Sequence, residues 1–247
     1  MSDGASLPNS FDIVIAVGPN DKEIIRSQME YTKPNIIGYR NIYLVSYDPS
    51  LQIDGCITIP ETMFPFSIET VSQYHGKLPR NGWYLQQLLK LYSSVVIPDL
   101  LERYLVIDSD TFFLKPTTFV KNGRCLYNYG SENHTPYFDH MRRVDPELTK
   151  VDPHKSGICH HMMFETTYLL ELMRKIEAIH REPFYVVFLK MVSDVNGSGA
   201  SEYEIYFHYM LKYHRDEIEI RPLNWRNGNR FSVNEQLDYI SYHWYMR

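Results

Sequence analysis

The chain has 247 residues, of which 44% are hydrophobic and 22% charged, as expected for a folded domain with a full core. The formal net charge of −5 excludes a generally basic nucleic-acid-binding surface, and no apolar run approaches the roughly 20 residues that cross a bilayer. The N-terminus has no secretory signal pattern, and three widely spaced cysteines fit a reducing compartment. We therefore expect a cytoplasmic protein without disulfides.

Short apolar runs alternate with helical patterns over the first 110 residues. Strands are expected at 11–17, 41–46, 56–59 and 104–107, and helices at about 21–31, 67–74 and 82–96. The second half is less regular, with strands expected at 159–164 and 239–242 and helices at 167–180 and 201–213. Strands that alternate with helices predict an α/β fold with a mostly parallel central sheet flanked by helices. We expect a disordered tail at 1–10 and a single domain at 11–247, whose second half is smaller and decorates a site built on the first.

The most informative segment follows the strand expected at 104–107. Asp108 and Asp110 come directly after this buried run, where open α/β sheets place their ligands. Alternate residues of an extended segment point the same way, so both carboxylates can face one site. They repel each other unless a cation lies between them, and Mg²⁺ or Mn²⁺ suits such oxygen ligands. The alternative is a solvated acidic turn at the end of a strand.

Three features in this order resemble GT-A-fold glycosyltransferases, over about residues 11–243. The Asp108–Asp110 segment, followed by an apolar run ending in Lys115-Pro116, is similar to the metal-binding motif of that fold. The end of the first expected strand, Val17–Asp21, resembles the opening nucleotide-binding strand of that fold. In the segment Tyr242–Trp244, His243 resembles a histidine near the end of such enzymes that often ligates the metal. The nearest relatives in this resemblance are small single-domain enzymes of bacteria and large DNA viruses that build surface glycans.

This resemblance implies a GT-A-like, Rossmann-like domain that moves a sugar from a nucleoside diphosphate donor, a UDP-sugar by family analogy, to a hydroxyl of a glycan or glycoconjugate. It implies a Mn²⁺ or Mg²⁺ ion held by Asp108, Asp110 and His243, with Asp110 in the most direct contact. Asp108 then binds ribose or acts through water. Further donor contacts are expected from Val17, Asp21 and Ser109. For His243 the alternative is a place in an aromatic cluster.

A helix expected at 82–96 precedes the acidic segment. Trp83, Gln87 and Lys90 recur at intervals of four and three residues and form one polar-aromatic stripe. Arg80 lies in the loop before this helix, where a guanidinium suits an anion. The pattern resembles the helix that helps hold the donor in related sugar transferases, so Arg80, Trp83 and Gln87 are donor-site candidates, with Lys90 behind them. The alternative is an ordinary amphipathic helix with a solvated polar face.

The candidate base lies at the start of the helix expected at 201–213. Inverting transfer needs a carboxylate that takes the proton of the acceptor hydroxyl. Ser201 and Glu204 have the spacing of a capping box, so Glu204 is expected to have a structural role. Glu202 is then the predicted base. It follows a loop at 196–199 that is expected to be mobile. A retaining mechanism, which needs no such base, is the runner-up.

Acceptor or sugar contacts are expected from the segment Ser156–His161. Ser156 and Gly157 occupy the place of a small-residue turn beneath the donor sugar in related enzymes. His160 and His161 are adjacent and point to opposite faces of a strand, so at most one of them faces the site. The competing non-enzyme interpretation is a nucleotide-sugar or carbohydrate-binding module that keeps the fold without turnover.

Overall fold

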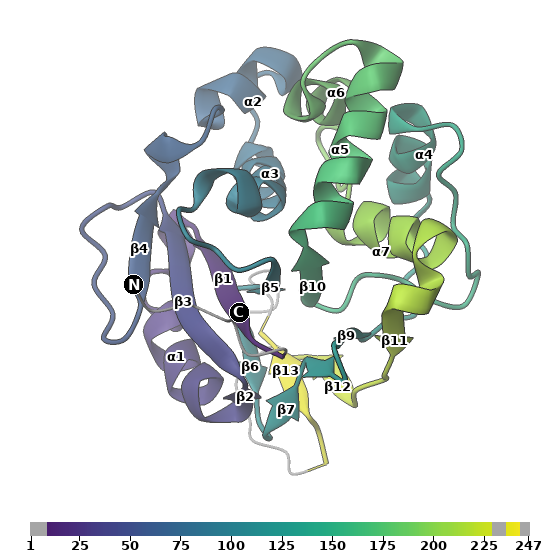
Figure 1. Ribbon diagram of the computed structural model, residues 1–247. Helices are drawn as coiled ribbons and strands as arrows, with labels where there is room; N and C mark the ends of the chain where they lie inside the picture. The colour runs from purple at the N-terminus through teal and green to yellow at the C-terminus, as the bar shows by residue number, and fades with distance from the viewer. Residues whose placement is uncertain (1–8, 229–235, 243–247) are drawn as a thin grey trace, which may run out of the picture.

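The computed structural model describes residues 9–228 and 236–242, and a five-stranded sheet in the order β10-β5-β1-β3-β4 forms its centre (Figure 1). Four of these strands run parallel, and β10 runs antiparallel to β5. Their bounds are β1 Phe11–Val17, β3 Tyr39–Ser46, β4 Ile57–Pro60, β5 Arg103–Ile107 and β10 His161–Glu165. The α/β fold with a mostly parallel sheet is therefore confirmed.

The central strand β1 is buried along its whole length, which is what a continuous apolar run predicts for a sheet covered on both faces. Its one charged residue, Asp12, is fully buried, and both of its carboxylate oxygens accept hydrogen bonds. Arg40 donates to both carboxylate oxygens, at 3.0 and 2.6 Å, and the N–H groups of Asn41 and Leu101 complete the set at 3.0 and 2.9 Å. Asp12 thus ties β1 to β3 and to the chain before β5.

Seven α-helices surround the sheet in the described part of the chain (Figure 1). They are α1 Ile24–Asn35, α2 Ile68–His75, α3 Asn81–Val96, α4 Thr135–Val144, α5 Thr166–His180, α6 Phe184–Lys190 and α7 Glu202–Tyr213. Helix α3 packs on β1, whereas α4, α5, α6 and α7 gather beside β10. Short 3-10 turns occupy Pro19–Asp21, Glu61–Met63 and Arg215–Glu217. Among the described helices, none is both long and apolar enough to cross a membrane.

Three small sheets extend this core. One has the order β12-β13-β6, with bounds Trp225–Asn227, Tyr239–Ser241 and Thr111–Phe113, and a second has the order β11-β9-β8, with bounds Ile218–Ile220, Arg124–Tyr127 and Val120–Lys121. The third pairs β2, Ile36–Ile37, with β7, Thr117–Thr118. Because β6 follows the acidic segment directly, the first of these sheets brings β13 to the candidate site.

The expected elements occur close to their predicted bounds, with local differences. The first helix begins later than expected, because Pro19–Asp21 forms a separate 3-10 turn. The strand expected at 159–164 begins only at His161. Helices α4 and α6 were not predicted, and of the short strands in the small sheets only β13 was expected, at 239–242. Residues 1–8 of the expected tail lie outside the described residues.

Candidate functional site

The acidic segment forms a tight turn between β5 and β6, at the edge of the sheet where the parallel strands end. The N–H of Thr111 donates to the carbonyl oxygen of Asp108 at 3.0 Å and closes the turn. Strands β1 and β5 are in register from Asp12 to Val14, so Val17, at the end of β1, lies at the same edge. Val17 and Ser109 are 1% and 2% exposed, and Asp21 lies in the 3-10 turn just beyond β1. The structure thus brings this group of predicted residues to one edge.

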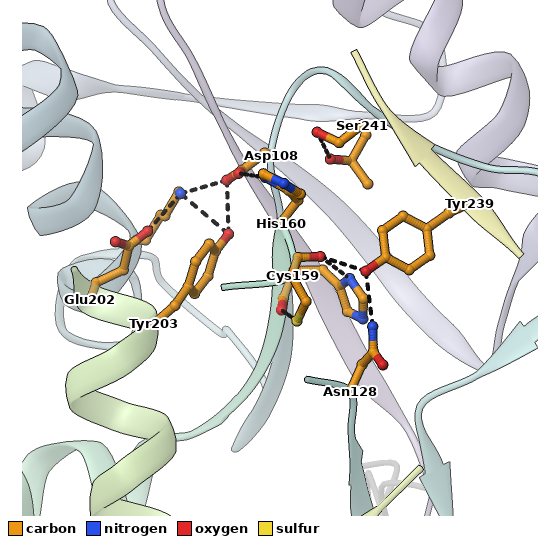
Figure 2. A network of polar contacts seen from close by, with 11 residues as sticks. Asp108, Asn128, Cys159, His160, Glu202, Tyr203, Tyr239 and Ser241 are labelled. Atoms are coloured by element: carbon orange, nitrogen blue, oxygen red, sulfur yellow. Dashed lines mark hydrogen bonds and ion pairs between the residues drawn. The ribbon is translucent and has the colours of Figure 1, made fainter. Parts of the chain in front are cut away.

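Asp108 is the centre of a network of polar contacts (Figure 2). Its Oδ1 accepts from the Lys90 ammonium at 2.6 Å and from the Tyr203 hydroxyl at 2.8 Å. Its Oδ2 lies 3.2 Å from Nδ1 of His160. A carboxylate offers about four lone-pair sites, so these contacts use most of its capacity. Asp108 is therefore held in a fixed orientation by its own chain.

Lys90 places a positive charge in the interior, where it is only 3% exposed. Its Nζ donates to Asp108 at 2.6 Å, to Glu202 Oε1 at 2.7 Å and to the Tyr203 hydroxyl at 3.2 Å. Burial alone would lower the pKa of Lys90, but the charges of Asp108 and Glu202 outweigh it and raise that pKa. Burial alone would raise the pKa of Asp108, but the charge of Lys90 outweighs it and keeps the pKa of Asp108 well below the ordinary value. Lys90 and Asp108 are therefore a charged pair.

Asp110 lies beside Tyr242, the residue that follows β13 by one position. It is 9% exposed, and its carbonyl oxygen accepts from the N–H of Tyr242 at 2.8 Å. Ser241 pairs with Thr111 in the β13–β6 ladder, which fixes this approach. The predicted ligand His243 follows Tyr242 in the chain and lies outside the described residues.

Among the described residues, no three side chains of His, Cys, Asp or Glu are grouped so that they could hold a metal ion. Asp108 has little free capacity, because three side chains contact its oxygens. A divalent ion at this edge would thus depend on Asp110, on the remaining capacity of Asp108 and on oxygen atoms from a ligand. This matches the way in which Mg²⁺-type ions bind one or two carboxylates together with substrate phosphates.

The start of helix α7 is fixed by side chains from other elements. The side-chain oxygen of Gln87 accepts from the N–H of Glu202 at 3.0 Å, and Ser201 Oγ accepts from the N–H of Glu204 at 3.2 Å. The other half of the expected capping box is not formed. Instead, the Glu204 carboxylate accepts from the Ser156 hydroxyl at 2.5 Å and from the N–H of Gly157 at 2.9 Å. Glu204 is thus structural, as expected, but it anchors the 156–157 turn rather than its own helix.

Glu202, the predicted base, lies inside this assembly. It is 3% exposed, and its Oε1 accepts from Lys90 at 2.7 Å. Burial raises the pKa of Glu202, the charge of Lys90 opposes this shift, and the charge of Asp108 adds to it. In the structure, the Glu202 carboxylate holds the Lys90 ammonium in place beside Asp108.

Arg80 contacts the loop before α7. Its Nη2 donates to Ser198 Oγ at 2.5 Å and its Nε to the carbonyl oxygen of Gly197 at 3.4 Å. The guanidinium also lies 4.4 Å above the ring of Trp83, a cation–π contact. Tyr84 adds a hydroxyl that donates to Gly197 O at 3.1 Å. The loop expected to be mobile is therefore tied to the start of α3.

The two adjacent histidines point in opposite directions. His160 contacts Asp108, whereas the His161 ring packs edge-on against Phe113 and Tyr239, with centroids 5.2 and 4.9 Å apart. Burial lowers the pKa of His161 to about 3, and the charge of Arg221 adds to the shift. His160 has φ of +64°, a left-handed conformation that is uncommon outside glycine and often marks functional sites. Only His160 is placed to contact a ligand at the acidic segment.

Two contributions to the site were missed from the sequence. Tyr203 was not among the predicted site residues, yet its hydroxyl binds Asp108. Lys90 was expected to stand behind the donor-site candidates, but Lys90 and Gln87 are both buried and bind Glu202 at the start of α7. The spacing of three residues between Gln87 and Lys90 was the available signal, because it puts both on one face of α3.

The fold and the site together define an α/β protein with two aspartates at the carboxyl edge of a mostly parallel sheet. The chain belongs to DUF6492, a family of unknown function, whose model matches residues 14–233. The matched range includes the acidic segment, Lys90 and Glu202, and it ends before β13. A comparison with curated proteins gave no match.

Proposed function

We propose that this protein is a metal-dependent glycosyltransferase that moves a sugar from a nucleoside diphosphate donor, a UDP-sugar, to a hydroxyl of a glycan. The observation that carries the proposal is the geometry of the acidic segment. Asp108 and Asp110 follow β5 at the edge where β1 also ends, which is where open α/β sheets bind their ligands. A cytoplasmic location stays a prediction from the sequence.

The chain's own residues divide the work at this edge. Asp110 is the primary candidate for holding Mn²⁺ or Mg²⁺, with His243 as the predicted further ligand. Lys90, Tyr203 and His160 orient Asp108, whose remaining oxygen capacity serves the ion or a ribose hydroxyl. A bound divalent ion would stabilise the negative charge of the departing nucleoside diphosphate.

The other predicted donor residues differ in how far the structure supports them. Ser109 belongs to the acidic segment, Val17 ends β1 at the same edge of the sheet, and Asp21 lies in the 3-10 turn just beyond β1. Arg80 and Gln87 already bind the loop before α7 and the start of α7 itself. Their support for donor binding is therefore indirect: they fix the elements that surround the site.

A binding module without turnover, or a retaining transferase, is the second candidate. The observation that favours it is the state of Glu202, the expected base, which is buried and paired with Lys90. Either alternative requires no proton acceptor at this position. The anomeric configuration of the product, read by proton NMR, separates inverting from retaining transfer.

The direct test is metal-dependent donor binding by the wild-type chain and by Asp110→Asn. We expect isothermal titration with UDP and Mn²⁺ to show binding to the wild-type chain, and Asp110→Asn to weaken it at least about tenfold, because the ion loses a charged ligand. Release of UDP from UDP-glucose, UDP-galactose or UDP-N-acetylglucosamine should fall in parallel. The control is Asp139→Asn, which removes a carboxylate paired with Arg142 on α4. Equal binding by wild type and Asp110→Asn would contradict the proposal.

A further inference from the structure

Strand β6, which follows the acidic segment, is the edge strand of its small sheet. On one side it pairs with β13, and next to this ladder the carbonyl oxygen of Asp110 accepts from the N–H of Tyr242 at 2.8 Å. Among the described strands, none pairs with the other side of β6. The carbonyl oxygens of Thr111 and Phe113 face that side, because alternate residues of a strand direct their backbone groups to opposite edges. An edge of this kind needs partners from elsewhere in the protein.

Helix α1 packs on this open edge and supplies the partners (Figure 1). Gln28 Nε2 donates to the carbonyl oxygen of Thr111 at 3.0 Å, and Asn35 Nδ2 donates to that of Phe113 at 2.7 Å. The two amides are separated by about two helical turns, so they lie on one face of α1. Side-chain amides of α1 thus take the place of a neighbouring strand.

The bond from Gln28 is made one residue away from Asp110, the primary candidate for holding the metal ion. Tyr242 binds the Asp110 carbonyl oxygen, and the N–H of Thr111 donates within the acidic turn at 3.0 Å. Gln28 adds a contact from a different element, on the Thr111 carbonyl oxygen. Together these bonds fix the backbone from which the Asp110 carboxylate projects. Such precision matters, since a displacement of about 1 Å at a reacting group can cost roughly 100-fold in rate.

Packing alone does not explain a glutamine at this position. The Gln28 side chain is fully buried, and within the described part of the chain its Oε1 has no hydrogen-bond partner. Thr32, one turn further along α1, is also fully buried, and its hydroxyl has no partner there either. An unsatisfied buried polar atom destabilises a fold, so this face of α1 would pack better with apolar side chains. The bond to Thr111 is what a glutamine supplies here.

We propose that Gln28 is a positioning residue, whose bond to Thr111 holds Asp110 in the orientation that binds the divalent ion together with the donor. The inference rests on the proposed function. Gln28 acts through the backbone of its partner and does not itself touch the ion. Helix α1 begins at Ile24, just after the 3-10 turn that contains Asp21, so the same helix also joins the predicted nucleotide turn to the ion site.

The test measures Mn²⁺ binding at saturating UDP, by isothermal titration, in the wild type and in Gln28→Met. Methionine keeps the length of the side chain and removes the amide donor. We expect the affinity for Mn²⁺ to fall about tenfold, because losing a group one step removed from a metal ligand typically costs roughly 10–100-fold. The midpoint of thermal unfolding without ligand should change by less than about 4 °C, since the unpartnered Oε1 is removed together with the hydrogen bond. A merely structural role would lower this midpoint and leave the affinity of the folded protein unchanged.

Two variants on the same face of α1 are the matched controls. Thr32→Val removes the buried hydroxyl that lacks a partner, and Asn35→Leu removes the equivalent bond to Phe113, further along β6 from Asp110. Both should change the affinity for Mn²⁺ by less than about twofold, because neither loses the contact next to the ligand.

The outcomes separate this inference from the proposed function. Equal affinity in Gln28→Met and the wild type, or an equal loss in Asn35→Leu, would overturn the inference and leave the proposed function standing. Failure of both Gln28→Met and Gln28→Leu to fold would also overturn it, because the amide would then serve the fold as a whole. A wild-type chain that binds neither UDP nor Mn²⁺ would overturn the proposed function itself.

Discussion

Lys90 is the residue whose removal should affect this protein most. Lys90→Met leaves Asp108 and Glu202 with buried, uncompensated charge, since each lies within 2.7 Å of the ammonium. Removing one partner of a buried ion pair costs about 3–5 kcal/mol. We expect the free energy of unfolding, measured with urea at pH 7, to fall by about this amount.

A surface ion pair provides the control for this prediction. Lys22 pairs with Asp48 at 2.7 Å, but the Lys22 side chain is 42% exposed. Solvent screens such a pair, so Lys22→Met should change stability far less. The double variant Lys90→Met with Glu202→Gln should recover part of the loss, because one of the two stranded charges is then gone. If Lys90→Met and Lys22→Met lowered the free energy of unfolding equally, the buried position of Lys90 would add nothing to the stabilising effect of its ion pairs.

Helix α7 is the element on which the rest of the site depends. Its first turn binds the acidic segment through Tyr203, helix α3 through Glu202 and the 156–157 turn through Glu204. These three residues are consecutive, so they point in three directions around the start of the helix. A shift of α7 would therefore disturb both aspartate orientation and the acceptor side at once.

Two glycines test this packing. A Cβ at Gly157 would lie 2.4 Å from the carbonyl oxygen of Tyr203 and 2.8 Å from Cβ of Phe207. Gly157→Ala therefore forces α7 or the turn to move, and we expect a loss of about 1–3 kcal/mol in unfolding free energy. A Cβ at Gly82, in the first turn of α3, meets nothing within 4 Å. Gly82→Ala should thus be neutral or stabilise by up to about 1 kcal/mol, since alanine favours helix. Thermal unfolding of both variants decides this, and equal destabilisation would contradict the contact argument.

At the scale of the whole molecule, the central sheet could be predicted because its strands carry their own signal. Strand β1 is apolar except for Asp12, and all seven of its residues are buried. The acidic segment was found for the same reason, since two aspartates end an apolar run abruptly. Helices α4 and α6 were missed: α6 has only seven residues, too few to show a clear helical period.

The contacts within the site were less predictable, because they join residues far apart in the chain. Helix α3 is buried on two faces: its leucines pack in the core, and Lys90 binds Glu202, which is 112 residues further on. The sequence predicted that the polar stripe of this helix contacts the donor, with a solvated face as the alternative, and neither interpretation placed Lys90 against another helix. Only the placement of α7 shows that Lys90 and Glu202 compensate each other's charge.

Buried histidines make the stability of the whole molecule depend on pH. His140 is fully buried, and its Nε2–H donates to the carbonyl oxygen of Phe188 at 2.8 Å. Burial lowers its pKa to about 4, and that of His161 to about 3, whereas an unfolded histidine titrates near about 6.5. The unfolded state therefore binds more protons below pH 6.5, so the stabilising effect of a neutral His140 is complete above that pH and is lost as the pH falls toward 4.

We expect His140→Gln to reduce the dependence of unfolding free energy on pH. Each such histidine contributes a slope of about 1.4 kcal/mol per pH unit below pH 6.5. Glu202, whose pKa is raised, acts in the opposite direction, but this term is common to wild type and variant. Urea unfolding at pH 7, 6 and 5 measures both slopes, and their difference isolates His140. Parallel curves for the two proteins would show that His140 is not kept neutral in the folded state.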